Sequence, residues 1–106
     1  MRRNIVIFDF EVFKFDTLLG AIVLRDDDAE LFQTWNLAEM IKFYEANKQS
    51  IWVGHNNAFY DNYILQEVVR GRSSPAIKKK SDELIQHSRK SYLDITLYWY
   101  LSLIHI

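Results

Sequence analysis

Three acidic residues follow apolar segments and are the strongest candidates for chemistry in this chain. Asp9 and Glu11 come after the apolar run 5–8 at alternate positions, and Asp61 comes after the apolar run 51–53. Alternate residues of an extended chain project to the same side, so Asp9 and Glu11 share a face. Two such carboxylates repel each other unless a cation lies between them, and Mg²⁺ prefers oxygen ligands. The pattern predicts a divalent-cation site, and a solvated strand end is the alternative.

Asp61 belongs to a second element, GHNNAFYD over 54–61, between a predicted strand and a predicted helix. Negative charge is favoured near a helix N-terminus, so helix electrostatics alone would explain a lone Asp there. Functional groups of α/β sheets, however, gather at the carboxyl ends of strands. Because both acidic elements follow apolar strands, we expect Asp9, Glu11 and Asp61 to converge.

The apolar pattern predicts an α/β fold whose mixed sheet has antiparallel strands first, parallel strands later and flanking helices. The predicted strands are 5–8, 18–24, 31–35, 51–53 and 92–98, and the predicted helices are 37–44, 59–69 and 76–87. The continuous run 5–8 is typical of a strand buried on both faces. Asn36 and Glu39 have capping-box spacing, and Gly71 is placed to end the second helix. Trp35, Trp52 and Trp99 are expected in the core.

Composition restricts the classes of function. The 106 residues suit one small domain, and the net charge of −1 argues against a passive nucleic-acid clamp more than against a metal nuclease, whose ions supply local positive charge. The absence of cysteine excludes disulfides and thiolate zinc sites. The apolar run near the start is too short for a signal segment or a membrane span, so we expect a cytoplasmic protein without membrane association.

The segments IVIFDFEVF and VGHNNAFYDNYIL resemble the first and second motifs of the DEDD superfamily of 3′→5′ exonucleases. The likeness is closest to the exonuclease domains of phage and family B-type DNA polymerases, covers residues 4–100 and implies a ribonuclease H-like fold. The family's second motif has an Asn, a short spacer and Phe-Asp. Here Tyr60 stands between Phe59 and Asp61, so either Asn56 or Asn57 is the substrate-facing amide.

The resemblance implies a two-metal hydrolysis of phosphodiester bonds at a single-stranded DNA 3′ end, using Mg²⁺ or Mn²⁺. Asp9 would bridge both ions, Glu11 would bind the ion that activates water, and Asp61 would hold the second ion. The implied partners are a primer terminus and a polymerase domain in the full-length chain. The implied substrate contacts are Phe10, Asn56, Asn57, Phe59 and Tyr60.

The family's third motif, Tyr-x-x-x-Asp or His-x-x-x-x-Asp, is not found. Tyr92 and Asp94 are too close together, and His87 and Asp94 are too far apart. Asp94 instead resembles an acid on a middle strand that precedes this motif, and we do not expect it to be catalytic. We expect residues 1–100 to be the N-terminal portion of an exonuclease domain, incomplete at its C-terminus, and residues 101–106 to be a non-native, adapter-derived tail.

This 106-residue chain is therefore expected to have little or no nuclease activity. Clear Mg²⁺-dependent degradation from the 3′ end, abolished by Asp9→Ala, would contradict that expectation.

Other interpretations stay open. The chain could belong to a free-standing DEDD exonuclease or exoribonuclease, or to an inert ribonuclease H-like binding module. The basic stretch 70–90 is by default a solvated face and alternatively a surface for the backbone of single-stranded DNA. His55 is expected to be a polar turn residue rather than a metal ligand.

Overall fold

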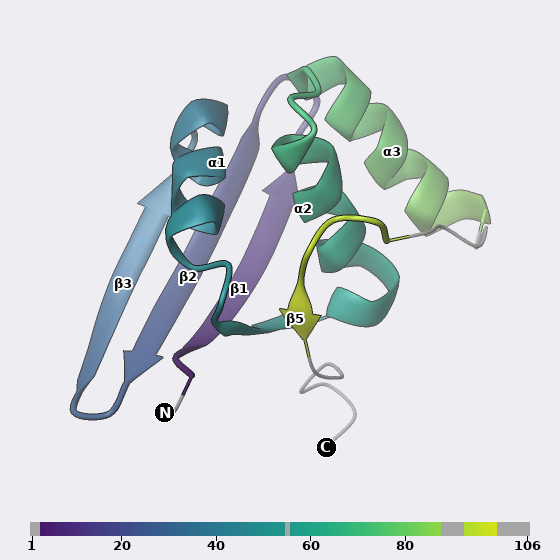
Figure 1. Ribbon diagram of the computed structural model, residues 1–106. Coiled ribbons are helices and arrows are strands. Elements are labelled where there is room, and N and C mark those ends of the chain that lie inside the picture. Colours follow the sequence, from purple (N-terminus) through teal and green to yellow (C-terminus); the bar gives the residue numbers. More distant parts are fainter. Residues whose placement is uncertain (1–2, 55, 88–92, 100–106) are drawn as a thin grey trace.

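A computed structural model of the protein describes residues 3–54, 56–87 and 93–99. The strands are β1 (Ile5–Val12), β2 (Thr17–Arg25), β3 (Asp28–Thr34), β4 (Ile51–Gly54) and β5 (Tyr98–Trp99). The helices are α1 (Leu37–Ala46), α2 (Asn62–Val69) and α3 (Ser74–His87), and a π-helix, η1 (Asn57–Asp61), precedes α2. The strands form one mixed sheet in the order β3-β2-β1-β4-β5 (Figure 1).

Strand β1 is the centre of this sheet. It pairs antiparallel with β2 and parallel with β4, and β2 pairs antiparallel with β3. The prediction that antiparallel strands come first and parallel strands later is therefore confirmed. β1 continues four residues past its predicted end, because its second half pairs with the start of β2, from Asp9 opposite Gly20 to Val12 opposite Thr17. Asp9 and Glu11 consequently lie inside the strand rather than beyond it.

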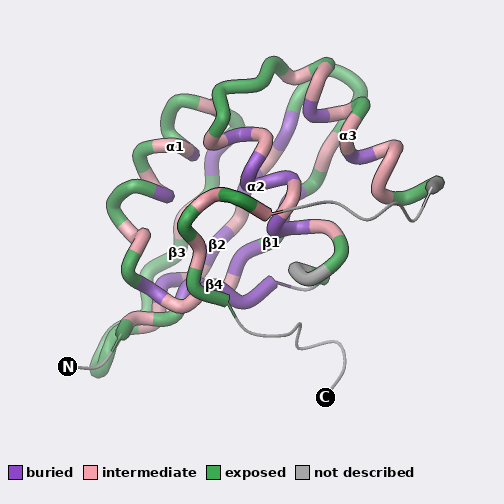
Figure 2. Tube along the Cα trace, turned by 45° about the vertical axis from the view of Figure 1, so that its right-hand side comes forward, coloured by how far each residue is buried: buried purple, intermediate pink, exposed green. Residues whose placement is uncertain are grey.

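The helices cover one face of the sheet. Val6, Phe8 and Phe10 of β1 are buried in a core to which α1, α2 and α3 contribute Met40, Leu65 and Ile77, among others. The alternate β1 residues on the opposite face are exposed or half-buried (Figure 2). The prediction that the run 5–8 is buried on both faces is wrong for the described part of the chain, because its three helices pack on the same side.

Local signals predicted the start of α1 and the end of α2 correctly, whereas α1 ends at Ala46 rather than 44, α2 begins at Asn62 rather than 59 and α3 begins at Ser74 rather than 76. The Asn36 side chain accepts a hydrogen bond from the Glu39 backbone N–H, as the capping-box spacing predicts. The Glu39 carboxylate does not complete the box, since it accepts from the Thr34 hydroxyl instead. Gly71 has φ of 77°, and the next N–H, of Arg72, donates to the Glu67 carbonyl, which closes α2 with a left-handed cap.

The tryptophans do not share one environment. Trp52 is fully buried, and its ring packs edge-on against Phe8 with centroids 5.1 Å apart. Trp35 and Trp99 are 51% and 37% exposed, so the expectation that both lie in the core is wrong. Each stands at the end of an outer strand, β3 or β5, where the described residues bury it only in part.

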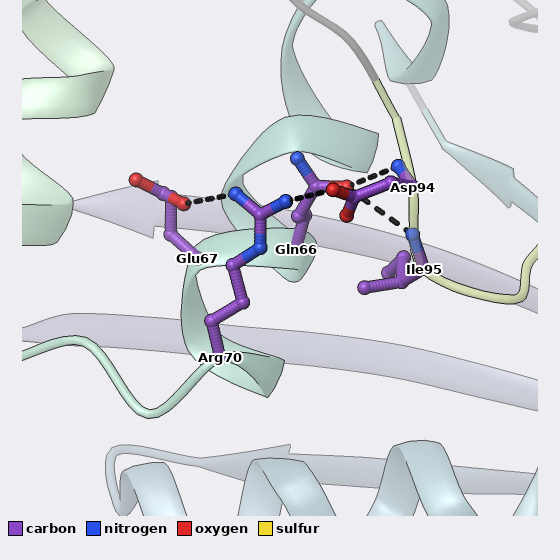
Figure 3. A network of polar contacts seen from close by, with 5 residues as sticks. All are labelled: Gln66, Glu67, Arg70, Asp94 and Ile95. Atoms are coloured by element: carbon purple, nitrogen blue, oxygen red, sulfur yellow. Dashed lines mark hydrogen bonds and ion pairs between the residues drawn. The ribbon is translucent and has the colours of Figure 1, made fainter.

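The segment 93–97 is held by α2 rather than by the sheet. The backbone N–H groups of Asp94 and Ile95 both donate to Oε1 of the buried Gln66, and the Asp94 carboxylate pairs with Arg70 (Figure 3). These N–H groups are unavailable for strand pairing, so within the described segment 93–99 only Tyr98–Trp99 forms a strand. The predicted strand over 92–98 is wrong for residues 93–97 and is confirmed only at Tyr98, and Tyr92 lies outside the described residues.

Replacing Gln66 by Leu tests this attachment. The variant removes the acceptor that two backbone N–H groups share, so we expect the free energy of unfolding to fall by about 1–3 kcal/mol in urea titrations. Arg70→Ala is the matched control on the same helix. Its ion pairs with Asp94 and Glu67 are partly exposed to solvent, so their loss should cost less than about 1 kcal/mol. A larger effect of Arg70→Ala than of Gln66→Leu would contradict this account.

Candidate functional site

Asp9 and Glu11 lie side by side on the face of the sheet opposite the helices. Both are exposed, and the residue between them, Phe10, is buried on the other side. Their partners across the strand pair are Gly20 and Leu18 of β2. The structure therefore places two carboxylates on one face in the second half of β1, as their alternate spacing predicts.

Asp61 is anchored to the same part of β1 through the backbone. It is 1% exposed; its Oδ1 accepts a hydrogen bond from the Phe10 N–H at 3.2 Å, and its Oδ2 accepts from the Asn56 N–H at 2.9 Å. The last pair between β1 and β4 is Phe8 with Gly54. Beyond that pair, the Asp61 carboxylate takes the place of β4 as hydrogen-bond acceptor for the Phe10 N–H. Hydrogen bonds to a carboxylate are stronger than neutral ones, and they fix the second acidic element against the first.

A π-helical turn explains how Asp61 faces inward despite the interposed Tyr60. The N–H groups of Tyr60 and Asp61 both donate to the Asn56 carbonyl, at 2.9 and 3.2 Å, and the second bond spans five residues. A π-turn accommodates one residue more than an α-turn and is frequent at functional sites. The widened turn absorbs the extra residue, and the carboxylate still reaches the sheet.

Tyr60 links this turn to α3. Its hydroxyl forms a 2.7 Å hydrogen bond with that of the buried Ser81. Burial is the largest effect and raises the pKa of the Tyr60 phenol above its ordinary value of 10.0. The Ser81 hydrogen bond lowers this pKa in part, and the weaker effects of the Asp61 and Asp9 charges raise it while that of Lys78 lowers it. The phenol is therefore a neutral hydrogen-bonding group near two carboxylates at physiological pH.

A hollow of about 480 Å³ opens beside Asp9 on the face opposite the helices. Its wall includes both carboxylates, Gly20 and apolar side chains of β1 and β2. A Cβ added at Gly20 would meet no atom within 4 Å, so the glycine leaves space directly across from Asp9. The prediction from sequence missed Gly20, although an isolated glycine inside a strand often marks a close approach by a ligand.

The expected substrate contacts occupy different environments. The Phe10 ring is buried in the core, facing away from Asp9 and Glu11. Phe59 is 68% exposed and Asn56 is exposed, so both can meet a ligand. The side chain of Asn57 and all of His55 lie outside the described residues. In the basic stretch, Lys78 pairs with Asp82, which neutralises part of its charge locally.

Asp61 is joined to the Asp9–Glu11 segment by a hydrogen bond to the backbone of Phe10, and the oxygen atoms of the three carboxylates do not meet at one point. Within 3–54, 56–87 and 93–99, no three His, Cys, Asp or Glu side chains are grouped to hold a metal ion. Asp9 and Glu11 project from the sheet, whereas the Asp61 oxygens face the N–H groups of Phe10 and Asn56. As donors, the carboxylates fit a hard divalent cation, and the Asp9–Glu11 pair is the part of the site that is open to one.

Comparisons with protein-family models, curated proteins and solved structures give no match to this chain. None of the helices in the described ranges has the length and apolarity needed to cross a membrane.

The two acidic elements should respond differently to truncation. Asp61→Ala removes the acceptor of two backbone N–H groups, one of them buried, and should lower the free energy of unfolding by about 1–3 kcal/mol. Asp9→Ala removes an exposed carboxylate beside another and should change it by less than about 0.5 kcal/mol. Urea denaturation followed by circular dichroism measures both. Equal losses for the two variants would show that Asp61 has no anchoring role.

Proposed function

We propose that this chain is part of a metal-dependent 3′→5′ exonuclease domain of the DEDD type, acting on the single-stranded 3′ end of DNA as in polymerase proofreading. The observation that carries the proposal is the hydrogen bond between the Phe10 N–H and the Asp61 carboxylate. This bond joins the two sequence motifs that resemble the family, because Phe10 lies between Asp9 and Glu11 in the first motif and Asp61 belongs to the second. Asp61 is 51 residues from Phe10 in the chain.

The architecture supports the same proposal. Three antiparallel strands are followed by strands parallel to β1, with helices packed on the sheet, which is the mixed sheet expected of a ribonuclease H-like fold. Strand β1 lies at the centre and carries Asp9 and Glu11 in its second half, and η1 follows the neighbouring parallel strand, β4. Functional groups gather at such strand ends in α/β sheets.

The residues have distinct roles in this proposal. Asp9 and Glu11 would hold two Mg²⁺ or Mn²⁺ ions on the exposed face, with Asp61 as the third carboxylate. Bound ions of this kind stabilise charge on the attacking and leaving oxygens of a phosphodiester. The Tyr60 phenol, bonded to the Ser81 hydroxyl, would hold η1 in place beside the site. The exposed ring of Phe59 would stack on the terminal base.

The wider biological setting belongs to the proposal as well. A proofreading domain acts beside a polymerase domain of the same protein and receives the primer terminus from it. Such a protein would work in the cytoplasm, or in the host cytoplasm if a phage encodes it. A free-standing DEDD exonuclease or exoribonuclease would use the same carboxylates, and digestion of matched DNA and RNA strands by a longer chain separates these cases.

A second candidate function is an inert ribonuclease H-like binding module. The observation that favours it is the arrangement of the acidic side chains. The described residues form no three-ligand cluster, and the Asp61 carboxylate accepts backbone hydrogen bonds. An inert module would have no need of a cation, so metal binding separates the two functions.

Thermal unfolding in the presence of Mn²⁺ tests the proposed function. A ligand at 100 times its dissociation constant stabilises the folded state by about 2.7 kcal/mol. Each kcal/mol raises Tm by about 4–8 °C in a domain of this size. We expect Mn²⁺ to raise Tm of the native sequence and to have little effect on Asp9→Asn.

Asp94→Asn is the control, since Asp94 is exposed and pairs with Arg70 away from this site. The control should keep the full Mn²⁺ shift. Absence of any shift in the native sequence would favour the inert module, and a shift kept equally in both variants would indicate that the cation binds away from Asp9.

A further inference from the structure

Two aromatic rings lie exposed beside the carboxylates. Phe13, one residue past β1, and Trp35, one residue past β3, contact each other with ring centroids 5.8 Å apart and planes inclined by 37°. They are 45% and 51% exposed. Large rings usually gain stability by burial, so a half-exposed pair of this kind indicates a surface that meets a partner.

The pair belongs to the same face as the candidate site. Asp9, Glu11 and Phe13 are alternate exposed residues of one segment. On β3, Thr34 is buried opposite Leu19, so the next residue, Trp35, comes level with Leu18, the partner of Glu11. Two strand spacings separate β1 from β3, which places the two segments only about 10 Å apart.

A positive charge follows Phe13 in the chain. The turn between β1 and β2 contains Lys14, whose Nζ lies 5.3 Å from the centre of the exposed Phe15 ring. The patch therefore combines flat aromatic surface, an ammonium group and two carboxylates suited to a cation. A base, a phosphate and a phosphate-bound cation of one nucleic-acid strand match these three features in turn.

We propose that Phe13 and Trp35 form a stacking site for unpaired bases of the strand whose 3′ end reaches Asp9 and Glu11. This inference rests on the proposed exonuclease function and extends it to the path of the substrate. Stacking on aromatic side chains tolerates any base, because every base has a π-face. The bases must be unpaired, since a duplex keeps their faces stacked on one another.

Fluorescence anisotropy with a labelled oligothymidylate tests the stacking site in the 106-residue chain, with Mn²⁺ present. Trp35→Ala should weaken binding about fivefold to a hundredfold, which is the effect of losing one base-stacking contact. Trp35→Phe keeps an aromatic face and should recover most of the affinity. An abasic strand of equal length should bind the native protein and Trp35→Ala alike.

Leu31→Ala is the matched control. Leu31 is on β3 at the position that shares a face with Trp35, is 80% exposed and is four residues away. Its replacement should leave oligonucleotide affinity unchanged. Equal binding by the native protein and Trp35→Ala would overturn the proposal, as would an equal loss in Leu31→Ala or equal affinity for duplex DNA.

The same samples separate this inference from the proposed function. If Mn²⁺ stabilises the protein but Trp35→Ala binds the oligonucleotide normally, the stacking site is wrong and the metal site stands. If Trp35-dependent binding occurs without any effect of Mn²⁺, the stacking site stands and the exonuclease function is wrong.

Discussion

The hydrogen bond from the Phe10 N–H to the Asp61 carboxylate holds the two acidic elements of this protein together. β4 ends at Gly54, opposite Phe8, so β1 extends beyond its parallel neighbour with a buried N–H that needs an acceptor. A buried carboxylate equally needs donors, and leaving either group without a partner costs free energy. The Phe10 N–H and the Asp61 carboxylate satisfy each other's hydrogen-bonding requirement. This bond positions η1 and the start of α2 against the centre of the sheet.

The two faces of the sheet have different roles: one packs in the hydrophobic core, and the other carries the candidate site. On the helix side, residues such as Phe8, Trp52 and Leu65 form the hydrophobic core against which β1 packs. The other face carries Asp9 and Glu11 on the same strand, with the space above Gly20 next to them. Sites built on strands are held more precisely than sites on loops, which a two-ion phosphodiesterase requires. The proposed function thus depends on a strand that is buried on one side and exposed on the other.

Sequence predicted the features that depend on neighbours along the chain. The shared face of Asp9 and Glu11 follows from strand periodicity. The start of α1 follows from the capping by Asn36, and the end of α2 follows from Gly71. The features it missed depend on distant segments. The hold of Gln66 on residues 93–97 requires α2 to lie beside a segment nearly thirty residues away. The exposure of Trp35 depends on which face the helices cover, a property that no local pattern contains.

Paramagnetic broadening by Mn²⁺ in an amide-resolved NMR spectrum tests the central claim most directly. Substoichiometric Mn²⁺ broadens nuclei close to the bound ion, so it reports which backbone segments surround the cation. If the Phe10–Asp61 contact assembles one site, the amides of Phe10, Gly20 and Asn56 should broaden together, and Asp61→Asn should weaken the effect at all three. Broadening confined to the acidic turn 26–28, or at Phe10 without Asn56, would contradict the account.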